Sequence, residues 1–223
     1  MKLAIFDFDG TLFPYDTLPF LLSQWKKQQY PIIPYLRTLS TVVVLYIQYK
    51  TGIRSRLSRE QMRQEAMFRF NRIFTAMSET QIDTFFENCA AKMTQLLNFK
   101  VVNEMKRSQQ EGYHIVLLSG CYEKLLHMIF APYHVDHIIG TAMYFTDGVI
   151  DANRKMEVVT GETKMQKIMA YYANERVDWN ASTAYADSYS DLPVLEAVGH
   201  AVAVGPEPKL KAVAEENNWR ILD

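Results

Sequence analysis

The feature that most constrains the fold is a short apolar run near the start of the chain that ends in acidic residues. Leu3 to Phe6 is continuously apolar and is followed at once by Asp-Phe-Asp-Gly-Thr, residues 7–11. A short continuous apolar run is typical of a strand that is buried on both faces of a parallel sheet. We therefore expect the chain to open with a central strand whose carboxyl end carries two aspartates.

Further short apolar runs alternate with helical patterns in the second half of the chain. Strands are predicted at residues 115–118, 184–186, 201–204 and 219–222. Helical patterns lie at residues 122–130, 163–172, 192–198 and 208–217. Strands that alternate with helices predict an α/β domain with a doubly wound parallel sheet, whose ligands bind beyond the carboxyl ends of the strands.

Residues 16–99 lack convincing strand alternation and carry helix signals instead. Ser58-Arg-Glu-Gln61 and Ser78-Glu-Thr-Gln81 have the capping-box pattern, and apolar residues follow each of them at helical spacing. We expect an all-helical cap domain of residues 16–99, inserted into an α/β core of residues 1–15 and 100–223. The 223 residues leave room for these two units and exclude three ordinary domains.

The composition limits which binding partners and which cellular compartment we expect. The chain has 24 Lys and Arg against 25 Asp and Glu, so its net charge of −1 gives no global attraction to nucleic acid, and we expect none as a partner. The two cysteines have no metal-like spacing, which favours reduced core residues and a cytoplasmic protein. Asp7 and Asp9 interrupt the opening apolar run, so we expect no cleaved signal peptide.

One segment of the predicted cap is unusually apolar. Residues 31–47 contain one arginine and two prolines, and arginines outnumber glutamates in residues 50–72 that follow. We expect a buried cap helix beside a solvated basic face, and a segment too interrupted to span a bilayer. Peripheral contact of residues 31–72 with an anionic membrane is an alternative that we do not favour.

The two aspartates after the first strand predict a metal site. Asp7 and Asp9 stand two residues apart, so both carboxylates can point into one crevice. Two anions this close repel each other unless a cation binds, and Mg²⁺ prefers such hard oxygen ligands. Gly10 permits a turn that other residues resist, and Thr11 offers a hydroxyl and an amide to an anion.

Three further polar positions follow other predicted strands or begin a helix. Ser119 closes a strand and can donate to a phosphate oxygen, although Ser is also a favoured helix N-cap. Lys164 lies near a helix start, where a cation is unfavourable unless an anion compensates it. Asp187 and Asp191 follow a short predicted strand. One carboxylate could bind a metal, and the other could hold a neighbouring side chain in place. The alternative role of Asp191 is a helix N-cap.

These residues carry a family resemblance. Asp7-Phe-Asp-Gly-Thr11, Leu118-Ser-Gly120, Lys164 and Asp187-Ser-Tyr-Ser-Asp191, in this order, resemble motifs one to four of the haloacid dehalogenase (HAD) superfamily of phosphatases. The helical insertion between the first two motifs resembles the C1 cap of the phosphoserine-phosphatase-like branch, subfamily IB. The resemblance implies a Rossmann-like core, a mobile helical cap and Mg²⁺-dependent hydrolysis of phosphomonoesters.

The resemblance also implies roles for the motif residues. Asp7 would attack phosphorus to give an aspartyl-phosphate, and Asp9 would protonate the leaving oxygen and then activate water. Mg²⁺ would be held by Asp7, by the backbone carbonyl of Asp9 and by Asp187. The phosphoryl oxygens would be bound by Lys164 and Ser119, assisted at Thr11 and Gly120, with Asp191 and Ser190 in support.

The sequence leaves the substrate open. Asp16 lies at the offset from Asp7 where phosphoserine phosphatases carry a glutamate that binds the substrate ammonium. A helix cap is the alternative role of Asp16. Arg54, Arg56 and Arg72 are candidates for binding a second anionic group of the substrate. Ser190 replaces an asparagine that is usual in true phosphoserine phosphatases. We expect a small organic phosphomonoester as substrate. The alternatives are a lipid phosphate of the phosphatidylglycerophosphate type and a non-enzymatic phosphate-responsive binding module.

Overall fold

Six parallel strands form the central sheet, in the order β3-β2-β1-β6-β7-β8. The computed structural model describes residues 1–52, 57–151, 154 and 156–223. The strands are β1 (Leu3–Phe6), β2 (His114–Tyr122), β3 (His137–Thr141), β6 (Thr183–Ala186), β7 (His200–Val204) and β8 (Arg220–Leu222). Because the strand order reverses beside β1, the carboxyl ends of β1, β2 and β6 meet at the edge where such folds bind ligands.

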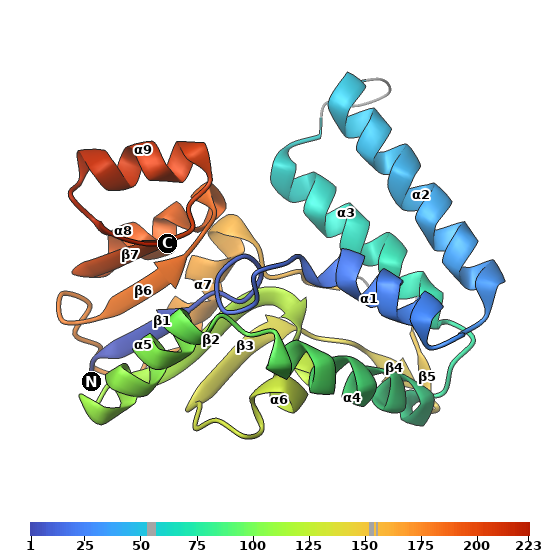
Figure 1. Ribbon diagram of the computed structural model, residues 1–223, viewed down its shortest axis with the longest axis horizontal. Coiled ribbons are helices and arrows are strands. Elements are labelled where there is room, and N and C mark those ends of the chain that lie inside the picture. The colour runs from blue at the N-terminus through green and yellow to red at the C-terminus, as the bar shows by residue number, and fades with distance from the viewer. Residues whose placement is uncertain (53–56, 152–153, 155) are drawn as a thin grey trace.

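Helices cover both faces of this sheet, as Figure 1 shows. They are α5 (Phe99–Gln110), α6 (Glu123–Phe130), α7 (Gly161–Tyr171), α8 (Leu192–Ala197) and α9 (Pro208–Glu216). In β1, Ala4 and Phe6 belong to the apolar cluster that includes α5 and α6, whereas Leu3 and Ile5 belong to the cluster that includes α7, α8 and α9. The prediction of a doubly wound parallel sheet with a doubly buried first strand is therefore confirmed.

In the described part of residues 16–99 the only regular elements are helices, joined by turns and loops, with one isolated bridge between Ser78 and Val149. Its elements are α1 (Thr17–Lys27), α2 (Ile32–Thr51), α3 (Arg59–Asn71), the 3₁₀ turn η1 (Arg72–Phe74) and α4 (Glu79–Gln95). Both predicted capping boxes form, at Ser58 with Gln61 and at Ser78 with Gln81. The division of the chain at residues 15 and 100 stays a prediction.

Buried aromatic rings join these helices to the sheet. Trp25, Phe74 and Phe85 pack edge to face or tilted with ring centroids 5.5–6.1 Å apart, and Phe86 lies 5.4 Å from Tyr122 at the end of β2. Such pairs add to the stability that burial alone gives. The base of the helical segment and the sheet therefore share one apolar core.

Four small elements are absent from the sequence prediction. They are β3, the hairpin of β4 (Phe145–Thr146) with β5 (Val149–Ile150), and the 3₁₀ turn η2 (Tyr189–Asp191). Asp147 and Gly148 form the hairpin turn, both at positive φ, which is the backbone that Asp-Gly favours. The amide of Glu79 at the start of α4 donates to the carbonyl of Gly148, so the hairpin contacts the inserted helices.

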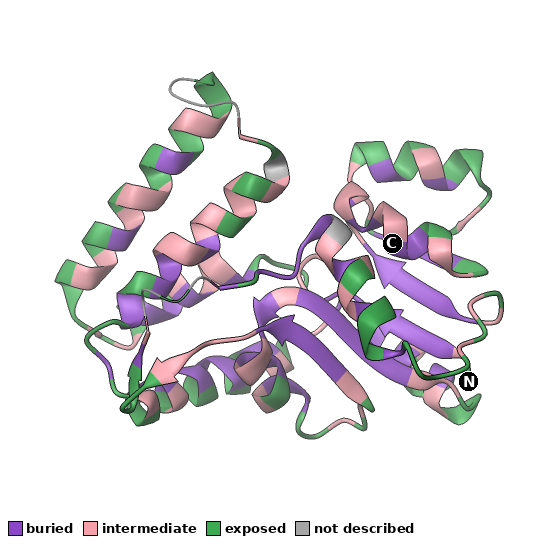
Figure 2. Ribbon diagram, turned by 180° about the vertical axis from the view of Figure 1, so that it is seen from behind, coloured by how far each residue is buried: buried purple, intermediate pink, exposed green. Residues whose placement is uncertain are grey.

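The expectation that residues 31–47 form a buried helix is wrong. Within α2 only Thr38 and Leu45 are buried, because α2 packs against α1, α3 and η1 on one side alone, and Figure 2 shows its other side exposed. The sequence also predicts a segment too interrupted to span a bilayer, yet α2 is long and apolar enough to do so by length and composition alone. The helix runs for 20 residues, and an 18-residue window has a mean hydropathy of 1.2.

Candidate active site

The loop after β1 is tightly folded around Gly10. The amide of Asp7 continues the ladder to β6 by donating to the carbonyl of Tyr185 at 3.0 Å. The amide of Gly10 then donates to the carbonyl of Phe13 at 2.7 Å, and Gly10 itself adopts a left-handed φ of 77°. A Cβ at this position would lie 2.2 Å from Oδ2 of Asp187, so the loop requires glycine there.

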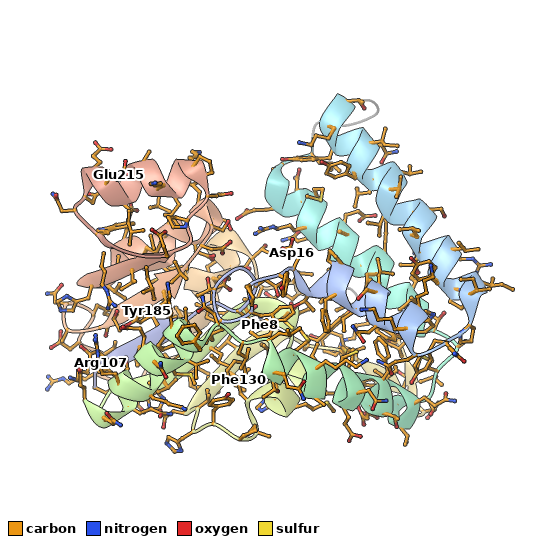
Figure 3. The ribbon with its side chains drawn as sticks, in the orientation of Figure 1. Phe8, Asp16, Arg107, Phe130, Tyr185 and Glu215 are labelled. Carbon is orange, nitrogen blue, oxygen red and sulfur yellow. The ribbon has the colours of Figure 1, made fainter. Side chains whose placement is uncertain are left out.

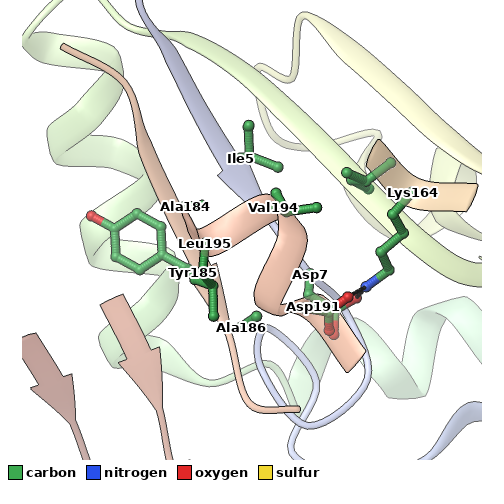
Figure 4. Close-up of a pocket in the computed structure, with 10 residues that line it drawn as sticks. Ile5, Asp7, Lys164, Ala184, Tyr185, Ala186, Asp191, Val194 and Leu195 are labelled. Carbon is green, nitrogen blue, oxygen red and sulfur yellow. Dashed lines mark hydrogen bonds and ion pairs between the residues drawn. The ribbon is translucent and has the colours of Figure 1, made fainter. Parts of the chain in front are cut away.

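Lys164 lies between two aspartates from different elements (Figure 4). Its Nζ is 2.8 Å from Oδ1 of Asp7 and 2.6 Å from Oδ1 of Asp191, and all three side chains are buried. The two anions raise the pKa of Lys164 above its ordinary value although burial opposes this, so the ammonium stays charged. The side chain of Asp191 pairs with Lys164 rather than capping α8, whose N-cap position it occupies.

A third carboxylate completes an acidic cluster with one lysine. Oxygen atoms of Asp7, Asp187 and Asp191 lie within 4.8 Å of one another. Burial and the negative charges of Asp7 and Asp191 raise the pKa of Asp187 to about 7. Three carboxylates with one cation leave an excess of negative charge, and carboxylate oxygens are hard ligands. The residues present therefore fit a divalent cation such as Mg²⁺.

The side chain of Asp9 contacts the first residue of α1. Its Oδ1 accepts from the amide of Thr17 at 3.1 Å and from the Thr17 hydroxyl. Burial raises the pKa of Asp9 to about 7, the hydrogen bond from the Thr17 hydroxyl opposes this rise, and the charge of Asp7 adds to it. A carboxyl with this pKa can hold a proton or release it near neutral pH.

The predicted phosphate-binding residues surround the end of β1. The buried hydroxyl of Thr11 has no hydrogen-bond partner within the part of the chain that the structure describes, so it can donate to a ligand. Ser119 and Gly120 lie where the register of β2 shifts against β3, and the buried Ser119 hydroxyl accepts from the amide of Cys121 at 3.2 Å. Because Tyr122 is the N-cap of α6, Ser119 does not serve as that cap.

A small cavity of about 10 Å³ lies beside Asp7, Lys164 and Asp191. It has room for about one water molecule. The cavity is therefore too small for a substrate. Figure 3 shows Asp16 between the inserted helices and the sheet. Asp16 is exposed at the N-cap position of α1, and its side chain makes no capping hydrogen bond.

Two of the four candidate specificity residues, Asp16 and Arg72, lie in the described part of the chain. Arg54 and Arg56 lie outside the described residues. Arg72 is exposed at the far end of α3, with its guanidinium 5.0 Å from the centroid of the Phe68 ring. Ser190 lies in η2 beside the acidic cluster, and its hydroxyl is 2.9 Å from that of Ser188.

Two residues at the site were missed by the sequence prediction. Thr17 holds Asp9, and Arg63 of α3 donates from Nη1 to the hydroxyl of Ser190 at 3.2 Å. Arg63 lies four and seven residues before Met67 and Phe70, both buried, so helical spacing places it on the inward face of α3. The position of Arg63 could therefore have been predicted from its spacing. No sequence pattern predicts the contact between Thr17 and Asp9.

The fold and site define a doubly wound α/β core with an aspartate loop after its first strand. Comparison with known proteins gives the family. Residues 4–196 match the haloacid dehalogenase-like hydrolase family. Because this match covers most of the chain, the chain belongs to that family.

Individual relatives agree with this assignment. Phosphoserine phosphatase SerB1 of Mycobacterium tuberculosis is 34% identical over 85 residues, which cover 38% of this chain and 28% of the relative. This chain thus spans less than a third of that protein's length. A Bordetella pertussis protein of unknown function has the same fold, with a TM-score of 0.80, 22% identity and coverage of 100% and 98% of the two chains. A phospho-aspartyl intermediate analogue of phosphoserine phosphatase has a TM-score of 0.64, 14% identity and coverage of 99% and 92%.

Proposed function

We propose that the protein is a Mg²⁺-dependent phosphatase that hydrolyses a phosphomonoester through an aspartyl-phosphate on Asp7. The observation that carries the proposal is the contact of Lys164 with Asp7 and Asp191, beside Asp187. It supports the proposal because a carboxylate that could act as nucleophile, an ammonium that could bind phosphoryl oxygens and carboxylates that could hold a metal lie within one small volume. Phosphoryl transfer requires mainly this kind of positioning and charge stabilisation.

In the first step a carboxylate oxygen of Asp7 attacks phosphorus, and the bond from phosphorus to the leaving oxygen breaks. Asp9 gives its proton to that oxygen. In the second step Asp9 takes a proton from water as the water oxygen attacks phosphorus, and the bond to Asp7 breaks. The pKa of Asp9, which burial raises to about 7, suits it to both proton transfers.

Asp7, Asp187 and the backbone carbonyl of Asp9 would hold Mg²⁺. When bound, the ion would neutralise charge on the phosphoryl group and on the aspartates. Lys164 would neutralise a further phosphoryl oxygen, and the hydroxyls of Thr11 and Ser119 would donate to the others. Asp191 would keep the Lys164 ammonium directed at the reacting group.

The substrate that we propose is a small organic phosphate like phosphoserine. The partial match to a phosphoserine phosphatase supports this class, and so does an exposed Asp16 beside Asp9, where a substrate ammonium would be attracted. A non-enzymatic binding module is less well supported, because it needs no proton donor such as Asp9. A lipid phosphate remains the second candidate for the substrate, supported by the exposed apolar face of α2.

Release of phosphate from p-nitrophenyl phosphate tests the proposal. Asp7→Asn should abolish Mg²⁺-dependent turnover, and Asp9→Asn should lower it by about 10²- to 10⁴-fold. Met169→Glu, at an exposed position of α7, is the control and should behave as the wild type. Undiminished turnover in Asp7→Asn would exclude the mechanism. A screen of amino-acid, sugar, nucleotide and lipid phosphates then separates the two substrate classes.

A further inference from the structure

The outer face of α2 is apolar and exposed. Ile33 is 70% exposed, Leu36 54% and Ile47 52%, and Ile32, Val43 and Val44 are exposed as well. Positions 33, 36, 40, 43, 44 and 47 recur at helical spacing, so they form one continuous stripe along the helix, and Ser40 is its one polar member. We call these residues the α2 stripe. An exposed contiguous apolar surface of this kind marks an interaction site.

The chain segment that contains the α2 stripe carries charges of one sign. Residues 17–59 contain no Asp and no Glu. They contain seven cations, which are Lys26, Lys27, Arg37, Lys50, Arg54, Arg56 and Arg59. Since the whole chain has a net charge of −1, this positive segment is a local excess. Its complement is an extended anionic surface that also accepts apolar side chains, which describes an anionic lipid bilayer.

The opposite side of α2 is attached to the protein by polar contacts. Arg69 of α3 donates from Nη1 to the carbonyl of Thr41 at 2.8 Å and pairs with Glu65 at the same distance. If α2 crossed a bilayer, these groups would have to enter hydrocarbon. A helix of 20 residues that lies flat instead presents about 30 Å of stripe to a surface. Arg37 and Lys50 are exposed beside it and can reach lipid phosphates.

We propose that the α2 stripe docks flat on an anionic lipid bilayer, with α2 in the plane of the interface. A second copy of the chain is a poorer occupant, because pairing two stripes would bring two segments of seven cations together without an acidic partner. The proposal concerns an interaction surface and is independent of the catalytic mechanism proposed for Asp7.

Cosedimentation of the full chain with lipid vesicles tests the proposal. The probes are vesicles of phosphatidylcholine alone and vesicles with about 30% phosphatidylglycerol, at low and at high salt. The wild type should bind the anionic vesicles at low salt and lose most of this binding at high salt. Val43→Glu/Ile47→Glu should weaken binding by about tenfold or more, because two charges would enter the interface.

The matched control is Phe99→Glu/Met169→Glu, which adds the same two charges at exposed apolar positions of α5 and α7. It should bind vesicles like the wild type, and circular dichroism should show that both variants are folded. Absence of binding by the wild type, or equal binding by the two variants, would overturn the proposal. A vesicle-free dimer of the wild type that Val43→Glu/Ile47→Glu dissociates would also overturn it, since the stripe would then belong to a second copy.

Discussion

The backbone amide and the hydroxyl of Thr17 both donate to Oδ1 of Asp9, so the first residue of α1 holds the second aspartate of the loop. Thr17 is buried and begins the helix that leads out of the sheet domain. A shift of α1 would therefore change both the direction and the pKa of the Asp9 carboxyl. The position of the inserted helices and the protonation of the proposed acid are linked through this one contact.

Thr17→Val should move the pH dependence of kcat/KM. The hydroxyl of Thr17 lowers the pKa of Asp9, so its removal raises that pKa. Because the first step needs protonated Asp9, the alkaline limb of the profile should move to higher pH, and turnover should fall by about tenfold. Thr17→Ser keeps the hydroxyl and is the control. An alkaline limb that is the same in both variants would contradict the role of this contact.

The stability of the metal-free protein should fall as pH rises from about 4 to about 7. Burial raises the pKa of Asp187 and that of Asp9 to about 7, whereas both carboxyls ionise near pH 4 in the unfolded chain. Between these values the folded state holds more protons than the unfolded state, so stability decreases with pH. Below this window both states are protonated and the penalty vanishes.

Thermal melts with and without Mg²⁺ measure this effect. At about 100 times its Kd, Mg²⁺ should stabilise the folded state by about 2.7 kcal/mol and raise Tm by about 5–10 °C. Asp187→Asn should be more stable than the wild type without metal at neutral pH, equal to it at low pH, and unresponsive to Mg²⁺. If the metal-free wild type instead gained stability relative to Asp187→Asn between pH 4 and pH 7, the predicted direction of the pH dependence would be wrong.

Gly10→Ala and Gly148→Ala form a matched pair of substitutions. The two glycines have nearly the same φ, 77° and 75°, so an alanine is similarly strained at each. At Gly10 the new Cβ meets Oδ2 of Asp187 at 2.2 Å, whereas at Gly148 nothing lies within 4 Å. Gly10→Ala should therefore lower kcat/KM by about 10²-fold, because Asp187, a proposed metal ligand, is displaced. Gly148→Ala should lower Tm alone, and equal losses of activity would refute the distinction.

The elements that carry the site could be predicted because they obey local rules. Leu3–Phe6 is uniformly apolar since both faces of β1 are covered. Asp7 and Asp187 directly follow strands, and Lys164 lies in the first turn of α7. The edge strand β3 was missed because its run, His-Ile-Ile-Gly-Thr, is short and contains glycine. Strand register and sheet order then bring Asp7, Lys164 and Asp191 together. This proximity cannot be predicted from any local sequence pattern.

The environment of α2 was predicted wrongly for a different reason. Its composition is that of a buried helix, and composition alone does not say whether another layer of protein covers it. The inserted segment supplies α1, α3 and η1 on one side and leaves the other side open. Contacts between segments far apart in the sequence also determine which arginine reaches the site. Helical spacing already places Arg63 on the inward face of α3, but only the fold shows that it reaches Ser190.

Arg63→Ala and Arg72→Ala should therefore differ in their effect on KM. Arg63 donates to Ser190 beside the acidic cluster, and its charge lowers the pKa of Asp191 against the stronger effect of burial. Arg72 lies nine residues further along, about 13 Å away by helical rise, and packs over Phe68.

Loss of Arg63 should raise KM for an anionic phosphomonoester by about tenfold and change kcat much less, because the guanidinium attracts the substrate without touching the reacting atoms. Arg72→Ala has the same change of charge and should leave both constants unaltered. Steady-state kinetics at low salt compare the two variants, and Arg63→Lys should recover part of the loss. Equal KM values for Arg63→Ala and Arg72→Ala would show that the attraction comes from the net charge of the helical segment. A specific position on α3 would then have no part in it.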